Sequence, residues 1–377
     1  MKHLRTYIDN TKSVITGSEL EIIHKFKNFP VFFGCTDLPK KNDLVANMIW
    51  GIDPKSGAIQ LTKLVPLKIL YQEQHTDGTG LTWKKYYEDF AIFIQKQNTK
   101  NILEIGGGTG QLAQNVIKTN PKIKWTIIEP NPIIKETKQI KVIKNFFDSS
   151  LKVKGKINTI ILSQVLEHIY NPREFILKIY DFLPVGGKVI IAYPQITTWL
   201  DQKYTNALNF EHTMLIDDFI EYLFIEQGFI IKKKNKYRDH STFIVAEKGT
   251  KKKLNINIPN KYYEYKRLFL NFISHHKKLV RELNLKIKKS KEPVYLFGAH
   301  IFATYLFSFG LSMNLAGILD NSLLKQNRRF YGTNFIVSSP SILKKLKKVN
   351  VICRAGLHSN EIKKNILENV NPNVKFW

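Results

Sequence analysis

A predicted strand that runs directly into a glycine-rich turn is the feature that most constrains the fold of this chain. Residues 101–110 read NILEIGGGTG, and the turn is expected to open a helix at Gln111. Because glycine has no Cβ atom, the backbone of such a turn can approach a flat, charged small molecule, while the helix N-terminus offers N–H groups to its polar end. The pattern predicts a nucleotide-type pocket, although glycines also form ordinary tight turns. The candidate ligand-binding residues of this turn are Glu104, Gly106, Gly108 and Gly110.

Strand and helix patterns alternate after this turn up to about residue 249. The segments are ILEIG, QLAQNVIKT, KWTIIEP, INTIILSQ, NPREFILKIYDFL, GGKVIIAYP, DDFIEYLFIEQG, FIIKKKN and TFIVAE. This alternation predicts a parallel sheet covered by helices on both faces. A long amphipathic segment follows at about 261–289, and a shorter alternation of strands and helices comes after it. We therefore expect an α/β protein with a central Rossmann-like domain and a smaller, Rossmann-like C-terminal α/β domain.

The length of 377 residues exceeds what one hydrophobic core usually holds, and a hydrophobic content of 43% supports several cores. The first part of the chain mixes short apolar runs with turns and is expected to form a small β-rich module. We expect boundaries at 1–80 for this module, 81–250 for the central domain, 251–290 for a linker and long helix, and 291–377 for the C-terminal domain.

The net charge is +27, from 58 Lys and Arg against 31 Asp and Glu. The lysines are scattered, and no arginine-rich stripe or RNP-like aromatic motif accompanies them, which argues against nucleic acid as a partner. The start of the chain has no apolar signal core and no apolar run reaches about 18 residues, so we expect a cytoplasmic protein with no membrane partner. Cys35 and Cys353 are the only cysteines, which excludes a disulfide framework and a cysteine zinc cage.

Glu129 ends the second strand of the central domain, roughly twenty residues beyond the glycine turn, where doubly wound folds place an acid on ribose hydroxyls. SQVLEHIYNP follows the fourth strand at 163–172, and GGKVIIAYP forms the fifth at 186–194. With the glycine turn, this set resembles the class I S-adenosylmethionine-dependent methyltransferases. The resemblance implies S-adenosylmethionine as the cofactor, with its methionine end at the glycine turn and its ribose at Glu129.

The same resemblance assigns the other cofactor contacts. By it, Asn145, Phe146 and Phe147 would lie by the adenine, Ser163 and Gln164 would line the floor, and His168 would complete the set. Other interpretations stay open: the two phenylalanines as core residues, Ser163 as a helix N-cap, and Glu167 with His168 as a solvated helix face. Glu129 is an acid at the end of a strand, directly before Pro130, and packing gives little reason for an acid there. It is therefore harder to interpret as a core residue.

An adjacent Glu and His lie farther along, in the loop NALNFEHTMLID at 206–217. Methyl transfer from a sulfonium needs an electron-rich acceptor aligned behind the methyl group, and often a base to generate it. The imidazole of His212 can take a proton near neutral pH while the carboxylate of Glu211 orients a partner or the substrate. These two are the candidate catalytic residues, although an isolated Glu-His pair is more often structural.

The Glu-His-Thr loop, the module ahead of the central domain and the segments VYLFGAHIFATYL and GILDNSLLKQNRRFYGT resemble the C-methyltransferases of deoxysugar biosynthesis. Those enzymes methylate a carbon next to a ketone on a nucleotide-linked hexose. The resemblance implies that His212 removes the proton α to the ketone, that an enolate takes the methyl group, and that the product serves surface-polysaccharide or related glycan assembly. It implies substrate contacts at Asn209, Gly298, Asp320, Asn321, Lys325 and Gln326.

The stretch 71–86 matches the part of these enzymes that covers the acceptor, so Tyr71, His75 and Trp83 are further candidates for substrate contacts. The alternative is that this stretch is a loop packed on the central domain.

Two departures from that family affect what the resemblance implies. The N-terminal module of the family holds zinc through paired C-x-x-C turns, whereas Asp53 and Ser56 stand in the corresponding turn here. Serine is a poor zinc ligand, so we expect a metal-free module held by packing alone, and we assign no metal ligands in the chain. Ahead of Glu211, Asn209 and Phe210 replace a tyrosine and a second histidine that are common in the family, so enolate stabilisation or the acceptor itself differs.

Three alternatives to C-methylation remain. The first is O- or N-methylation of a sugar or its phosphoryl decoration, with His212 deprotonating a hydroxyl. The second is a binding protein that uses a methyltransferase fold only as a scaffold, which would show no affinity for S-adenosylmethionine. The third is nucleic-acid methylation, whose signature would be salt-sensitive retention of RNA or DNA.

Overall fold

The computed structural model describes residues 1–71, 81–148, 151, 153, 155–215, 217–250, 255–354 and 359–377. The N-terminal elements are β1 (Lys2–His3), β2 (Ile8–Asp9), β3 (Glu21–Pro30), β4 (Cys35–Thr36), the 3-10 helix η1 (Lys40–Asn42), β5 (Leu44–Ile52), β6 (Ile59–Leu61), β7 (Lys63–Leu64) and α1 (Leu67–Leu70). Strand β5 is the centre of their sheet and pairs with β1, β3 and β6. Strand β6 also pairs with β13 (Met214–Leu215), which directly follows the Glu211–Thr213 segment. The sheet of the N-terminal module therefore holds one end of the loop that carries His212.

A cluster of hydrogen bonds centred on Asp53, called the Asp53 cluster below, occupies the turn where the resemblance places zinc cysteines. Asp53 Oδ2 accepts hydrogen bonds from the hydroxyls of Ser13 at 2.7 Å, Thr16 at 2.7 Å and Ser56 at 2.6 Å. The side chains of Asp53 and Ser56 are both fully buried. Hydrogen bonds to a carboxylate are among the stronger ones in proteins. The expectation that packing alone holds this module is therefore wrong, because one carboxylate links its two turns through three hydroxyls.

The central domain is a seven-stranded sheet in the order β10-β9-β8-β11-β12-β15-β14. The first five strands in that order are parallel, and β15 runs antiparallel to both of its neighbours. Its elements are α2 (Leu81–Gln95), β8 (Asn101–Ile105), α3 (Gln111–Thr119), β9 (Lys124–Ile128), β10 (Ile140–Ile143), β11 (Thr159–Ser163), η2 (Leu166–His168), α4 (Pro172–Phe182), β12 (Lys188–Pro194), α5 (Ile196–Asp201), η3 (Thr205–Ala207), η4 (Asp217–Phe219), α6 (Ile220–Glu226), β14 (Phe229–Tyr237) and β15 (Ser241–Lys248). The predicted α/β fold is confirmed, and α3 begins at Gln111 as predicted.

Helices cover both faces of this sheet. Phe90 of α2 and Val116 of α3 share one core cluster with Trp125 of β9. Ile176 of α4 and Leu223 of α6 belong to the core cluster that covers the other face. Helix α4 starts where the sequence provides an N-cap, because the side chain of Asn171 accepts from the N–H of Glu174 and Pro172 occupies the first turn.

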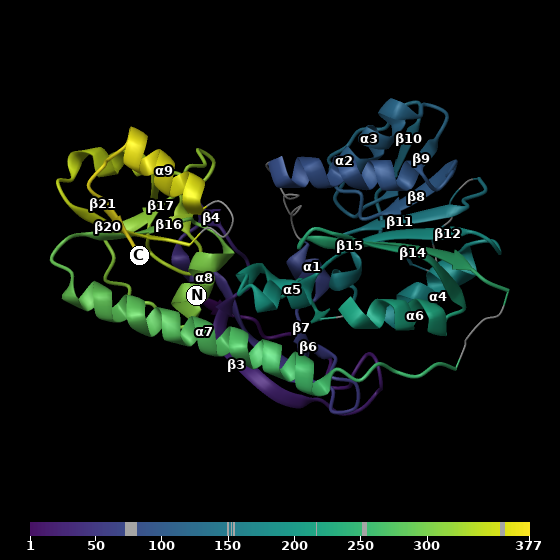
Figure 1. Ribbon diagram of the computed structural model, residues 1–377, viewed down its shortest axis with the longest axis horizontal. Helices are drawn as coiled ribbons and strands as arrows, with labels where there is room; N and C mark the ends of the chain where they lie inside the picture. The colour runs from purple at the N-terminus through teal and green to yellow at the C-terminus, as the bar shows by residue number, and fades with distance from the viewer. Residues whose placement is uncertain are drawn as a thin grey trace.

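The C-terminal domain is a smaller parallel sheet in the order β19-β17-β16-β20-β21. Its elements are α7 (Tyr262–Lys289), β16 (Val294–Phe297), α8 (Ile301–Ser308), β17 (Gly317–Leu319), β18 (Arg329–Phe330), β19 (Val337–Ser338), η5 (Pro340–Lys345), β20 (Val349–Cys353), α9 (Ser359–Asn369) and β21 (Val374–Phe376). Figure 1 shows this sheet at the left, the central sheet at the right and α7 running along the lower edge beside β3. Among the helices of the described residues, none combines the length and apolar character needed to span a bilayer.

The N-terminal module is tied to the C-terminal domain as well as to the central one. Strand β18 pairs with β4, and the guanidinium of Arg329 forms a bidentate ion pair with Asp43, with N–O distances of 2.7 Å and 2.5 Å. Both side chains are nearly buried. Tyr305 of α8 donates a hydrogen bond to the carbonyl of Leu208, in the loop that leads to His212. All three parts of the chain therefore contribute to the position of that loop.

Candidate active site

The glycine turn connects the carboxyl end of β8 with the N-terminus of α3. Gly106, Gly108 and Gly110 have φ angles of 78°, 43° and 72°, in the left-handed region that favours glycine. A Cβ atom on Gly106 would lie 2.6 Å from the Val165 side chain, and one on Gly107 would lie 2.6 Å from Ile127. At these positions the glycines let the turn pack against neighbouring side chains of the domain, and the turn leads directly into the N-terminus of α3. A helix N-terminus after a glycine turn is a place where the polar end of a ligand can bind.

Glu104 lies beneath this turn. Its side chain is 2% exposed, and Oε2 accepts a hydrogen bond from the indole N–H of Trp125 at 2.8 Å. That bond ties β8 to β9 under the glycines. The structure thus gives Glu104 a role in supporting the turn, whether or not it also contacts a ligand.

The residues assigned to ribose and adenine follow β9 and β10. Glu129 is half-buried at the end of β9, and its Oε1 accepts from the N–H of Asn131 at 3.0 Å. Phe146 is 44% exposed, and Asn145 is also exposed. Phe147 instead packs against Phe175 and Phe182 of α4. The core interpretation therefore fits Phe147, whereas the exposed ring of Phe146 is available to a ligand.

Ser163 ends β11, Gln164 follows it, and both join a partly buried hydrogen-bond network. The hydroxyls of Ser163 and Tyr86 are 2.8 Å apart, and Gln164 Nε2 donates to the hydroxyls of Ser241 at 2.9 Å and Tyr86 at 3.2 Å. Gln164 has a φ of 56°, and its N–H donates to the carbonyl of Ala192. Helix η2 begins only after Val165, so Ser163 is not its N-cap. Tyr86 is part of this floor although the sequence did not single it out.

Helix η2 places Glu167 inside the protein. Its side chain is 1% exposed, and His168 is half-buried beside it. His168 Nε2 lies 3.7 Å from Glu167 Oε1, and His168 Nδ1 lies 3.3 Å from the hydroxyl of Tyr71. The interpretation of this pair as a solvated helix face is therefore wrong, because the Glu167 side chain packs beneath the loop rather than projecting into solvent.

The loop between η3 and β13 positions His212. Asn209 Oδ1 accepts from the N–H of Glu211 at 2.7 Å and from that of His212 at 2.8 Å. The N–H of Thr213 donates to the carbonyl of Glu167 at 2.9 Å, and its own carbonyl accepts from Leu61 of β6 at 2.9 Å. Asn209 is 3% exposed and Phe210 is fully buried, so these two residues build the loop rather than offer a surface.

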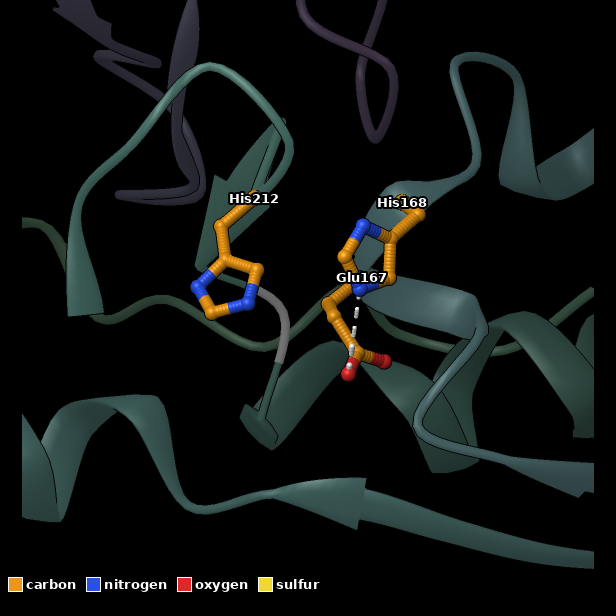
Figure 2. A group of neighbouring side chains, drawn as sticks. All are labelled: Glu167, His168 and His212. Carbon is orange, nitrogen blue, oxygen red and sulfur yellow. Dashed lines mark ion pairs between the residues drawn. The ribbon is translucent and has the colours of Figure 1, made fainter. Parts of the chain in front are cut away.

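The imidazole of His212 faces Glu167 and His168 (Figure 2). Its Nδ1 lies 3.3 Å from the carbonyl of Ala207, and the ring centroids of His168 and His212 are 5.2 Å apart. Trp199 of α5 lies at the other side of the ring, with a centroid distance of 6.4 Å. The structure thus brings together two histidines and a glutamate from loops that are far apart in the sequence.

Burial shifts the protonation equilibria of this cluster. It raises the pKa of Glu167 to about 8, outweighing a hydrogen bond from the residue's own backbone. Burial lowers the pKa of His212, against the opposing charge of the nearby Glu211. Asp217 is a second buried carboxyl group close by, and burial raises its pKa to about 6. Near neutral pH, the site therefore combines a neutral imidazole, which can accept a proton, with carboxyl groups that hold protons unusually well.

The substrate candidates in the stretch 71–86 do not lie together. Tyr71 touches the cluster through His168, whereas Trp83 packs on Tyr86 and His240 with centroid distances of 5.4 Å and 4.8 Å. The packing of Trp83 agrees with the alternative of a segment packed on the central domain. His75 lies outside the described residues.

The C-terminal candidates gather at the carboxyl ends of β16 and β17. Gly298 has a φ of 104°, and Asn321 is exposed. Both carboxylate oxygens of Asp320, in the turn after β17, accept hydrogen bonds from the protein. Oδ2 accepts from the N–H of Ala299 at 2.9 Å and from the ammonium group of Lys325 at 3.0 Å, and Oδ1 accepts from the N–H of Ser322. Gln326 donates to the main-chain carbonyl of Asp320 at 2.9 Å. Asp320 and Gln326 therefore shape this turn themselves.

Comparison with known proteins matches part of the chain to one family. Residues 82–233 match a family described as a methyltransferase domain, Methyltransf_23. No curated protein matches the chain. Solved structures that resemble part of it include an O-methyltransferase family protein from Burkholderia thailandensis, with 11% identity over 45% of this chain and 57% of that chain at a TM-score of 0.36. Human N-acetylserotonin methyltransferase in complex with S-adenosylmethionine gives 18% identity over 49% and 59%, also at 0.36. The chain spans less than two thirds of the length of either structure.

Proposed function

We propose that the chain uses S-adenosylmethionine to methylate a nucleotide-activated sugar, and the match of residues 82–233 to a methyltransferase domain supports the methyl-transfer part of this proposal. The observation that supports this acceptor site is the position of His212 beside η2. Helix η2 follows the carboxyl end of β11, and the glycine turn follows that of the adjacent strand β8. In open α/β sheets, ligands bind at the carboxyl ends of the strands, so the cofactor turn and the candidate base share one edge.

The described residues fit the cofactor. The bare backbone of the turn at Gly106–Gly110 and the N-terminus of α3 would hold the methionine end, and Glu129 would take the ribose hydroxyls. The exposed ring of Phe146 would cover the adenine. When bound, S-adenosylmethionine supplies a methyl group on a sulfonium, which needs no electrophilic assistance from the protein. What the protein must add is an aligned acceptor and a base.

We assign the role of base to His212. Its Nδ1 faces the carbonyl of Ala207, and a hydrogen bond there fixes the tautomer that leaves Nε2 free of a proton. In this reaction the proton moves from the carbon next to the ketone to Nε2, and the resulting enolate carbon forms the new C–C bond. Bound S-adenosylmethionine would supply the methyl group to this carbon, and the electron pair of its C–S bond would remain on sulfur. The negative charge of Glu211 favours the imidazolium that forms.

The C-terminal domain is proposed to hold the nucleotide. Its turn after β17 combines an exposed Asn321 with the ammonium group of Lys325, which also pairs with Asp320. Gly298 follows β16 and leaves room for the ring of His300, which a Cβ atom there would meet at 2.5 Å. Cations near such a turn favour a diphosphate. The contact of Tyr305 with Leu208 connects this domain to the acceptor loop, so nucleotide binding and loop position would be linked.

O- or N-methylation is the second candidate, and one observation favours it. Phe210 is fully buried and the amide of Asn209 is occupied by backbone groups, so these positions present no hydroxyl or imidazole to an enolate oxygen. With a hydroxyl or amine as acceptor, His212 would remove its proton in the same geometry.

The test is to incubate the protein with S-adenosylmethionine and a panel of nucleotide 4-keto sugars, and to locate any added methyl group by mass spectrometry and NMR. Methylation on carbon supports the leading proposal, and methylation on oxygen or nitrogen supports the second candidate. Calorimetry that detects no binding of S-adenosylmethionine would exclude both, leaving the fold as a scaffold.

A further inference from the structure

Three side chains from two separate segments converge on one point inside the protein. Glu167, His168 and His212 each offer one ligand atom, and these atoms all lie within 4.8 Å of one another. Figure 2 shows the ring of His168 above the Glu167 carboxylate and the ring of His212 to the left of both. Glu167 and His168 come from η2, whereas His212 comes from the loop before β13. The sequence predicts no metal site, because His212 is distant in the sequence from the adjacent Glu167 and His168 and joins them only when the chain folds.

The outer nitrogen of each histidine is held by a neighbouring group. His212 Nδ1 lies 3.3 Å from the carbonyl of Ala207, and His168 Nδ1 lies 3.3 Å from the hydroxyl of Tyr71. With Nδ1 engaged in this way, Nε2 of each ring is directed toward Glu167. Metal-binding histidines nearly always have their second nitrogen anchored by a carbonyl or other polar group, because that bond fixes the tautomer and the ring orientation.

The carboxylates of this region are incompletely satisfied. Among the described residues, Glu167 Oε2 and Asp217 Oδ1 are buried side-chain oxygens without a hydrogen-bond partner. Glu167 is 1% exposed, so water does not compensate it from outside. A buried carboxyl group without a full set of partners is costly unless it keeps a proton or meets a cation. A cation that replaces the carboxyl proton would give the unpaired oxygen of Glu167 a partner.

We propose that Glu167, His168 and His212 form a binding site for a divalent first-row transition-metal ion. Two imidazoles and one carboxylate are a donor set that such ions prefer, whereas Mg²⁺ and Ca²⁺ prefer oxygen ligands only. Ligands about 2.1 Å from a tetrahedral ion lie about 3.4 Å apart, so binding draws the three side chains together by up to about 1.5 Å. Three protein ligands leave at least one coordination position open.

Metal binding and the proposed catalytic role use the same atom. His212 Nε2 cannot coordinate an ion and accept a proton at once, so the bound ion holds the enzyme in an inactive state. The existence of the site does not rest on the proposed function, whereas its effect on turnover does.

The test uses the full chain, freed of metal with a chelator and then dialysed. Titration with Co²⁺ should produce visible d–d absorption that saturates at one equivalent, and Zn²⁺ should displace the Co²⁺ signal. His168→Asn and His212→Asn should each weaken Co²⁺ binding by at least 100-fold, and Glu167→Gln should do the same. His275→Asn on the exposed face of α7 is the matched control and should leave the titration unchanged. Circular dichroism and S-adenosylmethionine binding show whether each variant is folded.

No saturable Co²⁺ signal, or a signal that survives in folded His168→Asn and His212→Asn proteins, would overturn the metal site. The outcome for methyl transfer separates the two proposals. Inhibition by Zn²⁺ that a chelator reverses supports both. Turnover that requires the metal supports the site and overturns His212 as the base. Turnover that depends on His212 without any metal binding overturns the site alone.

Discussion

The main-chain N–H of Thr213 donates a hydrogen bond to the carbonyl of Glu167 at 2.9 Å. The side-chain hydroxyl of Thr213 lies within hydrogen-bonding distance of the carbonyls of Glu167 and Ile169. These contacts fasten the loop that carries His212 to the helix that carries His168. They also explain why a histidine that follows the fifth strand lies beside residues that follow the fourth.

Substitution of the proposed base separates binding from chemistry. His212→Asn removes the proton acceptor but keeps a polar side chain of similar reach. A general base contributes about 10²- to 10⁴-fold, so we expect turnover to fall by that factor while S-adenosylmethionine affinity changes less than about twofold. Single-turnover kinetics and calorimetry measure the two quantities. Unchanged turnover would remove His212 from the role of base.

The glycine turn should be sensitive to a single methyl group. Gly107→Ala places a Cβ atom 2.6 Å from Ile127 Cγ2 and 3.0 Å from Glu104 Oε2, so these side chains must shift. Overpacking of this kind costs about 1–3 kcal/mol, and we expect weaker S-adenosylmethionine binding together with a lower melting temperature. Gly317→Ala is the matched control, since its Cβ would meet only the ring of Tyr295, at 3.2 Å. Equal S-adenosylmethionine affinity in both variants would contradict a cofactor role for the turn.

The Asp53 cluster should stabilise the fold of the N-terminal module, as a structural metal ion would. Asp53→Ala leaves the hydroxyls of Ser13, Thr16 and Ser56 without their shared acceptor, and we expect a loss of about 3 kcal/mol in the free energy of unfolding. Burial raises the pKa of Asp53, but the three hydroxyls and a backbone N–H outweigh it and hold the pKa below the ordinary 3.8.

A lowered folded pKa gives the pH dependence of this effect its sign. The stabilisation by Asp53 is fully present above pH 3.8 and is lost as the pH falls through the lower, folded value. The difference in unfolding free energy between the wild type and Asp53→Ala should therefore be constant at higher pH and shrink on acidification. Denaturant titrations at several pH values measure it, and a difference that grows toward low pH would contradict this assignment.

The link between the C-terminal domain and the acceptor loop can be tested with one hydroxyl. Tyr305 is fully buried, and its hydroxyl donates to the carbonyl of Leu208. Tyr305→Phe leaves that buried carbonyl without this donor, at a cost of about 1–3 kcal/mol, while the ring packing on Phe29 remains. We expect reduced kcat with unchanged S-adenosylmethionine affinity. Tyr263→Phe, on a residue 86% exposed, is the control, and equal kinetics in both variants would show that the link does not reach the site.

The sequence predicts the parts of this protein whose signals are local. The strand, glycine turn and helix around Gly106 appear as expected, because hydrophobic periodicity and glycine's conformational freedom act over a few residues. Contacts that depend on tertiary packing were not predicted. Glu167 belongs to a helix of only three residues, too short to show a buried face by periodicity, and only the fold brings His212 beside it.

The sequence of the N-terminal module carries a signal for the Asp53 cluster. Ser13 and Thr16 have the same spacing as Asp53 and Ser56, and the two pairs together mark the four corners of one site. The pattern S-x-x-T with D-x-x-S could have suggested that hydroxyls and a carboxylate replace the four ligands of a zinc site. The floor residue Tyr86 had no such signal, because an aromatic residue on an amphipathic helix is typical of ordinary core packing.

The most direct test of the central claim is solvent exchange at the acceptor carbon. The protein is incubated in D₂O with S-adenosylhomocysteine and a nucleotide 4-keto sugar that the wild-type enzyme methylates, so that proton removal can occur without methyl transfer. We expect deuterium incorporation next to the ketone with the wild type and none above background with His212→Asn. Carbon methylation by the wild type with equal deuterium incorporation in both proteins would contradict the assignment of His212 as the base that generates the enolate.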